Sequence, residues 1–239
     1  MENKRLGIIG GMGPKATSVF FDKIIENTVA DRDQDHIDMI ILNHSTLPDR
    51  TDVILKNDPE RFLNAVEKDI RLLEHAGVQN IAIPCNTSHY FHERMQAMTD
   101  VHIIHIIHET LKVVRDKFGP RSKVGILATN GTLQSGIYNS ACQKYGMELH
   151  VPDEPVQQRI MDIIYNDIKR GLAISSTGIE DIIHKLITDD QCNCVIIACT
   201  ELSCITLSAQ TQAYCVDAMD VLVKRSIELS GKHSRLKFS

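Results

Sequence analysis

The strongest constraint on the fold is a strand–helix pattern that occurs twice along the chain. Gly7 begins a short apolar run and lies 78 residues before Cys85, while Gly125 begins a similar run and lies 74 residues before Cys199. Each cysteine ends an apolar run of its own and is followed at once by hydrogen-bonding residues. Duplication of one α/β unit is the simplest explanation of this pattern.

Strands are expected to alternate with amphipathic helices in both halves. Pro14 suits the first turn of a helix after the glycine turn at 10–13, and a second helix opens at Asp58-Pro59 and stops before Gly77. Such alternation implies parallel sheets, which bind ligands beyond the carboxyl ends of their strands. The expected strands are 6–9, 37–42, 81–84, 101–107, 123–127, 195–199 and 213–217.

These observations predict an α/β fold of two similar lobes related by pseudo-twofold symmetry. Each lobe is expected to hold a mainly parallel sheet flanked by helices, with a cysteine at the carboxyl end of one strand, where parallel sheets bind ligands. The first lobe is predicted to span 1–105 and to be joined by the C-terminal segment 214–239, and the second lobe to span 106–213. A chain of 239 residues is long enough to bury a core in both.

Charge and composition exclude several classes of partner. The formal net charge is −5 with a pI near 6.1, and the charges are interspersed, without the basic stripe of a nucleic-acid surface. No apolar run reaches the roughly 18 residues of a spanning helix, and no export signal is present. We therefore expect a cytoplasmic protein without nucleic-acid or membrane partners. The seven cysteines, an odd number, fit free thiols in a reducing compartment.

Cys85 and Cys199 form the candidate catalytic pair. Each is expected to follow a buried strand and to precede a helix, whose N-terminal N–H groups favour a thiolate. Inverting a carbon centre without a cofactor requires one group that removes a proton and another that delivers one on the opposite face. A thiol, with an ordinary pKa of about 8.5, can do either. The pair therefore predicts proton transfer on both faces of a small substrate.

Four segments resemble the cofactor-independent aspartate/glutamate racemase superfamily, and most closely its aspartate racemases. They are Gly10-Gly11-Met12-Gly13-Pro14, Leu47-Pro48-Asp49-Arg50-Thr51, Pro84-Cys85-Asn86-Thr87-Ser88-His89 and Ala198-Cys199-Thr200-Glu201-Leu202. The resemblance covers nearly the whole chain. It implies a pyridoxal-phosphate-independent isomerase that interconverts L- and D-aspartate, with Cys85 and Cys199 as its acid/base residues. It also implies that the active site lies in the cleft between the two lobes, that no cofactor is used and that the protein is a homodimer. No metal site is expected from the spacing of the cysteines and histidines.

The resemblance extends to substrate-binding residues. Arg50 offers a planar fork that matches a carboxylate, and Lys169 is expected to join it, with neighbouring Arg170 as the rival. Two such cations favour an acidic amino acid. The Pro48-Asp49-Arg50 turn stands where glutamate racemases carry a Pro-Tyr-Gly segment, which favours aspartate. Donors to the α-carboxylate are expected from Asn86, Thr87, Ser88 and Thr200, and further cleft residues are Met12, Gly13, Asn43, Thr129, Gly131, Thr132 and Glu201.

Other functions fit parts of the sequence. The segment 11–16 matches a Gly-x-Gly-x-x-Ala dinucleotide fingerprint, but the second strand ends without an acidic residue and Pro14 removes one N–H donor. A cleft-type ligand-binding sensor would need Arg50 but not both thiols. Within the racemases, glutamate or a broader range of amino acids is an alternative substrate.

The remaining cysteines and the histidines are given structural interpretations. His102, His105 and His108 recur every third residue, whereas a zinc-binding helix prefers a spacing of four. His89 is expected either to influence Cys85 or to lie on a helix surface. The cysteines assigned to packing or to the surface are Cys142, Cys192, Cys194, Cys204 and Cys215.

Overall fold

The computed structural model describes residues 4–172 and 175–238, and it contains two four-stranded sheets of equivalent topology. Their strand orders are β2-β1-β3-β4 and β6-β5-β7-β8, and every pairing is parallel. The predicted two-lobe α/β fold and its internal duplication are therefore confirmed. The strands are β1 Leu6–Gly10, β2 Met39–Asn43, β3 Asn80–Ala82, β4 His102–Ile103, β5 Lys123–Leu127, β6 Glu148–His150, β7 Cys194–Ile197 and β8 Cys215–Asp217.

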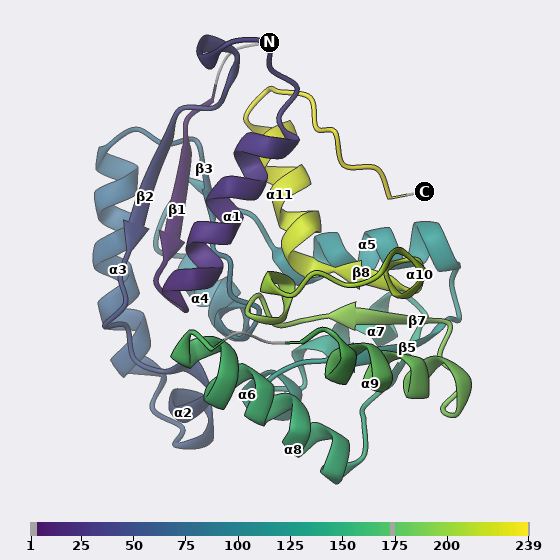
Figure 1. Ribbon diagram of the computed structural model, residues 1–239. Coiled ribbons are helices and arrows are strands. Elements are labelled where there is room, and N and C mark those ends of the chain that lie inside the picture. Colours follow the sequence, from purple (N-terminus) through teal and green to yellow (C-terminus); the bar gives the residue numbers. More distant parts are fainter. Residues whose placement is uncertain (1–3, 173–174, 239) are drawn as a thin grey trace.

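Helices cover both faces of the first sheet. In Figure 1, α3 (Pro59–His75) lies on one side of the strands, and α1 (Pro14–Asn27) and α11 (Ala218–Leu229) lie on the other. Neighbouring side chains of β1 serve these two layers, because Ile9 packs in the cluster with α3 whereas Ile8 packs in the cluster with α1 and α11. Strands that are buried on both faces read as continuous apolar runs, as this sequence does.

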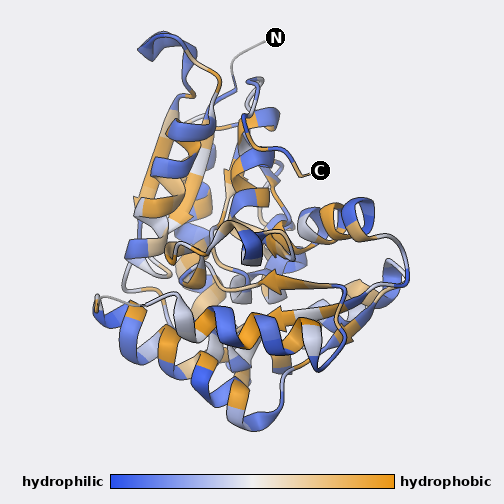
Figure 2. Cartoon of the chain, turned by 45° about the vertical axis from the view of Figure 1, so that its right-hand side comes forward, coloured by the Kyte–Doolittle hydropathy of each residue, from blue (hydrophilic) through white to orange (hydrophobic). Residues whose placement is uncertain are grey.

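The second sheet is covered in the same way. α8 (Glu154–Asp162) and α9 (Thr177–Thr188) pack against Leu127, Val195 and Ile197 on one face. α5 (Ile106–Phe118) and α7 (Ile137–Lys144) pack against the other face. Figure 2 shows that the strands are predominantly hydrophobic, while the helices alternate between hydrophobic and hydrophilic faces.

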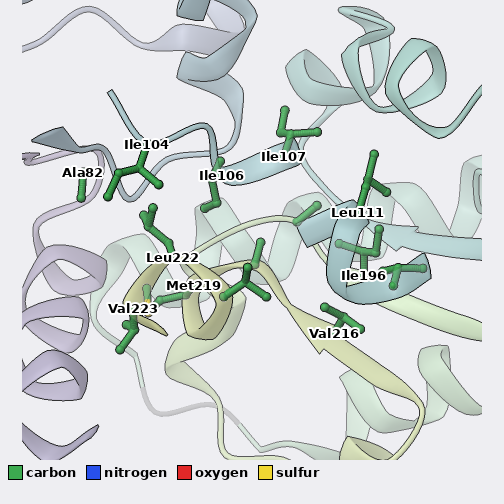
Figure 3. Close-up of a cluster of buried hydrophobic side chains, with 14 of the residues drawn as sticks. Ala82, Ile104, Ile106, Ile107, Leu111, Ile196, Val216, Met219, Leu222 and Val223 are labelled. Carbon is green, nitrogen blue, oxygen red and sulfur yellow. The ribbon is translucent and has the colours of Figure 1, made fainter. Parts of the chain in front are cut away.

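One apolar cluster is shared by the two lobes. Figure 3 shows Ala82 and Ile104 of the first lobe close to Leu222 and Val223 of α11, with Ile196 of β7 in the same cluster. α11 follows the last strand of the second sheet but packs against α1 and β3, whereas α5 follows the first sheet and packs against β8 and α7. Because each fully buried Ile or Leu contributes about 1.5–3 kcal/mol, this common core joins the lobes into one folding unit.

Two sequence predictions require correction here. The expected strand 101–107 is mostly wrong, because β4 ends at Ile103 and α5 begins at Ile106. The His105 side chain accepts the backbone N–H of His108 and so caps α5, and the buried positions of α5 then follow a helical period. The segment 214–239 is predicted to join the first lobe, and α11 within it does pack against α1 and β3, but β8 at its start pairs with β7 of the second sheet. The other lobe boundaries stay a prediction.

Short helical turns complete the described chain, and several of them hold the strand ends. The short elements are η1 Asp33–Asp35, α2 Arg50–Leu55, η2 Thr87–Phe91, α4 His92–Gln96, α6 Asn130–Gln134, η3 Ile163–Asp167, η4 Ile168–Arg170, η5 Leu202–Cys204 and α10 Ala209–Gln212.

No helix in the described ranges is long and apolar enough to span a membrane.

Candidate active site

Cys85 and Cys199 lie just beyond the carboxyl ends of β3 and β7, the corresponding strands of the two sheets. Both are 5 % exposed, and together they line one small chamber between the lobes. The structure therefore brings the two predicted thiols together. The helices that follow them, η2 and η5, are short 3₁₀ turns instead of the α-helices that the sequence suggested. A helix dipole is correspondingly a minor influence on either thiol.

The chamber has room for about one water molecule, with a volume near 20 Å³. It adjoins a larger cavity of about 1010 Å³, and the two share Asp49, Arg50, Lys169 and Glu201 as a common boundary. An amino acid can reach the thiols only if these boundary side chains move. The chamber is lined by Met12, Asp49, Arg50, Thr51, Cys85, Asn86, Thr87, Thr129, Tyr165, Lys169, Ala198, Cys199, Thr200 and Glu201.

Arg50 is the cation associated with Cys85. It begins α2, whose first turn is capped by the Asp49 carboxylate, and its side chain is buried under the loop that precedes the helix. Its Nη1 donates to the Pro48 carbonyl at 3.0 Å, and its Nε has no partner in the described chain. Burial opposes the charge of Arg50, but the neighbouring Cys85, Asp49 and Glu201 side chains hold its pKa above the ordinary value.

Cys199 has a different environment. Its Sγ lies 3.1 Å from Glu201 Oε2, and Glu201 Oε1 lies 3.0 Å from the Lys169 ammonium. Burial, followed by the charge and hydrogen bond of Glu201, raises the pKa of Cys199 well above its ordinary value. Burial and the neighbouring carboxylate therefore hold Cys199 as a thiol, and they outweigh the effect of the short turn that follows it.

Lys169 reaches the site from an irregular stretch of helix. α8 continues into the π-helical turn η3 and the 3₁₀ turn η4, which bring Tyr165 and Lys169 to the chamber. The Lys169 ammonium lies 5.0 Å from the Tyr165 ring centre, and the charge of Glu201 raises the lysine pKa against the opposing effect of burial. Arg170, the rival residue, lines neither cavity. Sequence reasoning missed Tyr165, although its position four residues before Lys169 placed both on one helical face.

Hydrogen bonds across the lobes hold the two cysteine turns together. Thr200 Oγ1 donates to the Pro84 carbonyl at 2.9 Å, which ties the Cys199 turn to the Cys85 turn. The Tyr138 hydroxyl donates to Asn86 Oδ1 at 2.6 Å. Tyr138 is a second residue that the sequence did not indicate, because it lies on α7, far from any strand end.

Threonine hydroxyls make a further contact between the lobes. Thr87 Oγ1 lies 2.8 Å from Thr132 Oγ1 and 3.1 Å from Thr129 Oγ1. Beside them Gly131 packs tightly, since a methyl group at that position would lie 2.7 Å from the Thr51 Cα. Thr87 and Thr129 line the chamber, whereas Thr132 and Gly131 do not. Thr132 contacts the hydroxyls of both lining threonines.

Some predicted residues are not brought to the lining of either cavity. Asn43 is exposed at the end of edge strand β2, and its amide lies 3.4 Å from the Ser45 hydroxyl. Ser88 is fully buried, and its hydroxyl donates to the Cys85 carbonyl at 2.7 Å. The sequence prediction therefore misplaces Asn43, Ser88 and Thr132, because a strand-end position does not fix the direction of a side chain.

The glycine turn faces the same site. Gly13 lines the larger cavity, and a Cβ atom there would lie 3.4 Å from Glu201 Oε1. Gly11 has a φ of +87°, and a side chain there would collide with the backbone of His44. A carboxylate beside the turn is unfavourable for a pyrophosphate, which argues against the dinucleotide interpretation.

The other cysteines and the histidines lie outside this chamber. Among the described residues, no group of three or more His, Cys, Asp or Glu side chains is arranged to hold a metal ion. His89 is 1 % exposed, and its Nδ1 lies 2.8 Å from the Cys85 carbonyl, so its alternative placement on a helix surface is wrong. Cys142, Cys192 and Cys194 are buried, and Cys204 and Cys215 are partly buried.

Comparison with known proteins agrees with this geometry. Residues 9–225 match the profile of a family described as Asp/Glu/Hydantoin racemase. The chain belongs to that family. It is 30% identical over 231 residues to the "Broad specificity amino-acid racemase RacX" of Bacillus subtilis (strain 168), a match that covers 93% of this chain and 96% of the relative.

Solved structures of this racemase family share the fold. The Picrophilus torridus aspartate racemase superposes with a TM-score of 0.83 at 28% identity, covering 98% of this chain and 97% of that one. An aspartate racemase homologue from Pyrococcus horikoshii OT3 gives a TM-score of 0.77 at 24% identity, covering 95% and 99%. A glutamate racemase from Francisella tularensis gives 0.62 at 18% identity, covering 96% and 81%. The last two comparisons concern the fold alone.

Proposed function

We propose that this racemase-family protein interconverts L- and D-aspartate without pyridoxal phosphate, using Cys85 and Cys199 as its two acid/base residues. The observation that carries the proposal is that both thiols line one chamber whose boundary holds Arg50 and Lys169. Two proton carriers and two cations are what inversion of an acidic amino acid requires.

The two thiols begin the reaction in different surroundings. Glu201 accepts a hydrogen bond from the Cys199 thiol and keeps the proton on that sulfur, whereas the charged neighbour of Cys85 is the Arg50 guanidinium. Cys85 therefore removes the α-proton from one face, and Cys199 delivers its proton to the other. Lys169 compensates the negative charge that then appears on Cys199 beside Glu201. The enantiomer that turns its α-hydrogen toward Cys85 meets the resting enzyme ready to react.

Substrate binding assigns the two cations to two carboxylates. Arg50 keeps an unpaired Nε and matches a carboxylate as a planar fork. The Lys169 ammonium exchanges part of its contact with Glu201 for the substrate. Asn86 Nδ2, which has no partner in the described chain, and the Thr87 hydroxyl are hydrogen-bond donors around the reacting carbon. The Thr200 hydroxyl, expected from the sequence to be another donor, gives its one proton to the Pro84 carbonyl instead.

A broader substrate range is the second candidate. The larger cavity beside the chamber is lined partly by Leu47, Ile168, Leu172 and Ile205, which suit apolar side chains better than a second carboxylate. The relative at 30% identity is named as a broad-specificity amino-acid racemase. We also propose a cytoplasmic homodimer, in keeping with the resemblance and the seven free thiols. Sedimentation of the purified protein tests the dimer.

The decisive experiment follows hydrogen exchange and chirality together. The purified, reduced protein is incubated in deuterated water with each enantiomer of aspartate, glutamate and leucine, and with no added cofactor. Cys85→Ser and Cys199→Ser variants are run beside the wild type, and Cys142→Ser, a buried cysteine outside the chamber, is the matched control.

Each outcome has a defined meaning. Inversion of aspartate with solvent deuterium at the α-carbon, lost in both chamber variants but not in the control, is the expected result. Comparable inversion of leucine selects the broad-specificity candidate. If folded wild-type protein exchanges no α-hydrogen of these amino acids, the amino-acid racemase proposal is wrong.

A further inference from the structure

A second cavity lies between the lobes and is separate from the catalytic chamber. Its volume is about 470 Å³, within the range of small-molecule sites. None of the described residues that line it lines the chamber or the larger cavity beside the chamber. Its walls come from α2, the start of α3, η2, α4 and the start of α5, and from α7 and the turn before it in the second lobe.

Four histidines line this cavity as a packed cluster. The ring centre of His105 lies 4.2 Å from that of His92, 4.1 Å from that of His108 and 5.5 Å from that of His89. His92 Nε2 donates to the Ile103 carbonyl at 2.9 Å. His105 Nδ1 accepts the backbone N–H that caps α5, so its Nε2 carries the ring proton and is a donor.

The surroundings of the cluster favour a negative ligand. In the described ranges, none of the four rings lies within ion-pair distance of a carboxylate, while Lys144 on α7 lines the cavity without a carboxylate partner. Arg94 is already bound to Glu60. The charged and titratable groups around the rings are Glu93 and Arg94 on α4, His102 on β4, Glu109 and Lys112 on α5, and Lys144.

Burial keeps the imidazoles neutral when no ligand is bound. Burial, followed by the charges of neighbouring rings, lowers the pKa of His89 to about 4 and that of His105 to about 2. Clustered imidazoles of this kind gain protons when an anion is placed beside them, because the anion offsets both desolvation and mutual repulsion.

We propose that this histidine cavity binds a small organic anion that carries a flat apolar group. The anion lies against His105, His108 and Lys144, and the apolar group packs between Ile54, Phe91, Ile137 and Ala141, which line the same cavity.

His89 connects the cavity to the catalytic turn. Its Nδ1 lies 2.8 Å from the Cys85 carbonyl and its Nε2 lies 3.2 Å from the Ile104 carbonyl. A neutral ring carries one N–H and donates to only one of these carbonyls, whereas an imidazolium donates to both. An anion in the cavity favours the imidazolium and so tightens the turn that holds Cys85.

Benzoate is the probe for this site, and benzamide is its neutral counterpart. Titration calorimetry of the full chain at about pH 6 and about pH 8, in buffers of different ionisation enthalpy, measures affinity and proton uptake. The cavity variant combines His108→Asn with Lys144→Ala. The control combines His75→Asn with Lys68→Ala, both exposed on α3. Arg50→Met removes the catalytic anion site in a further sample. The rate of Cys85 alkylation is followed with and without benzoate.

Benzoate is expected to bind about tenfold more tightly at the lower pH with proton uptake, to outcompete benzamide, and to change the rate of Cys85 alkylation. Binding should persist in the α3 control and in Arg50→Met but be lost in the cavity variant. Three results would overturn the proposal. They are loss of binding in Arg50→Met but not in the cavity variant, equal affinity at both pH values, and no saturable binding at about 10 mM benzoate. Because these readouts measure binding and alkylation, they stand apart from whether aspartate is the substrate.

Discussion

The thiol of Cys199 donates to Glu201, with 3.1 Å between Sγ and Oε2, and this contact makes the two cysteines of the chamber unequal. Cys85, in the matching position of the other lobe, has Arg50 as its charged neighbour instead. Duplication of the α/β unit therefore preserved the two thiols but not their surroundings. A proton on one sulfur and a negative charge on the other is the starting state that a two-thiol inversion needs.

Glu201→Gln should lower the pKa of Cys199, because it removes the negative charge that, together with burial, raises it. The pH at which iodoacetamide begins to modify Cys199 should therefore shift downward. At a fixed pH the alkylation rate should rise about tenfold for each unit by which the pKa falls. Exchange of the substrate α-hydrogen should fall in the same variant. Residue-resolved mass spectrometry measures the alkylation. Glu154→Gln, at an exposed position of α8, is the control, and an unchanged Cys199 profile would contradict the role of Glu201.

Tyr138→Phe should weaken both stability and turnover. The change removes the hydroxyl that donates to Asn86 Oδ1 at 2.6 Å and leaves a buried amide oxygen unpaired, which costs about 1–3 kcal/mol. Asn86 lines the chamber beside Cys85, so its reorientation should lower kcat more than it raises KM. Urea unfolding and steady-state kinetics measure the two effects. Tyr90→Phe, at a residue that is 49% exposed, should change neither, and equal behaviour of the two variants would refute the role of the hydroxyl.

Asp217 should make stability fall as the pH rises toward neutrality. Burial, followed by the charge of Asp220, raises its pKa to about 7, above the ordinary value near 3.9 of an unfolded chain. Unfolding then releases a proton between these values, so the free energy of unfolding decreases with pH by up to about 1.4 kcal/mol per unit. This contribution is complete below about pH 4 and is lost as the pH passes through about 7.

Asp217→Asn isolates this effect. The amide oxygen can still accept from the Ser203 hydroxyl and cap α11, but it does not titrate. Relative to the variant, the wild type should lose about 1–2 kcal/mol of unfolding free energy between about pH 5 and pH 7, as measured in urea. Asp116→Asn on α5, where the side chain is 65% exposed, should leave the pH dependence as it is. If the unfolding free energies of Asp217→Asn and the wild type change in parallel over this pH range, Asp217 does not titrate within it.

The fold follows from local patterns in the sequence. Apolar runs such as 6–10 and 123–127, glycine turns and the proline at the start of α1 indicate βα units, and repetition of the units indicates equivalent sheets. The error at 101–107 has a local cause. A run of isoleucine and histidine suits a strand or a buried helix, and the cap formed by His105 decides for the helix from Ile106 onward.

The candidate site could be predicted only as far as its motifs reach. Cys85, Cys199, Arg50 and Lys169 line one chamber as the motifs suggested, because strand ends of parallel sheets converge. Tyr138 was invisible in the sequence, since it reaches the site across the lobe interface from α7. The link between Glu201 and Cys199 was also hidden, because it depends on the turn in which the Leu202 N–H donates to the Cys199 carbonyl.

Arg50→Lys tests whether the substrate is held by a planar fork or by charge alone. Lysine keeps the positive charge near Cys85 but cannot form two parallel hydrogen bonds to a carboxylate, and its shorter reach loses the contact with the Pro48 carbonyl. The KM for aspartate should rise by about tenfold or more, equivalent to about 1.4 kcal/mol of binding free energy. The kcat should change little, because lysine keeps a positive charge near Cys85. Steady-state racemisation measured by circular dichroism gives both constants. Arg71→Lys on α3, where the side chain is 54% exposed, should match the wild type. A fall in kcat at constant KM would instead place Arg50 in the proton transfer at Cys85, not in substrate binding.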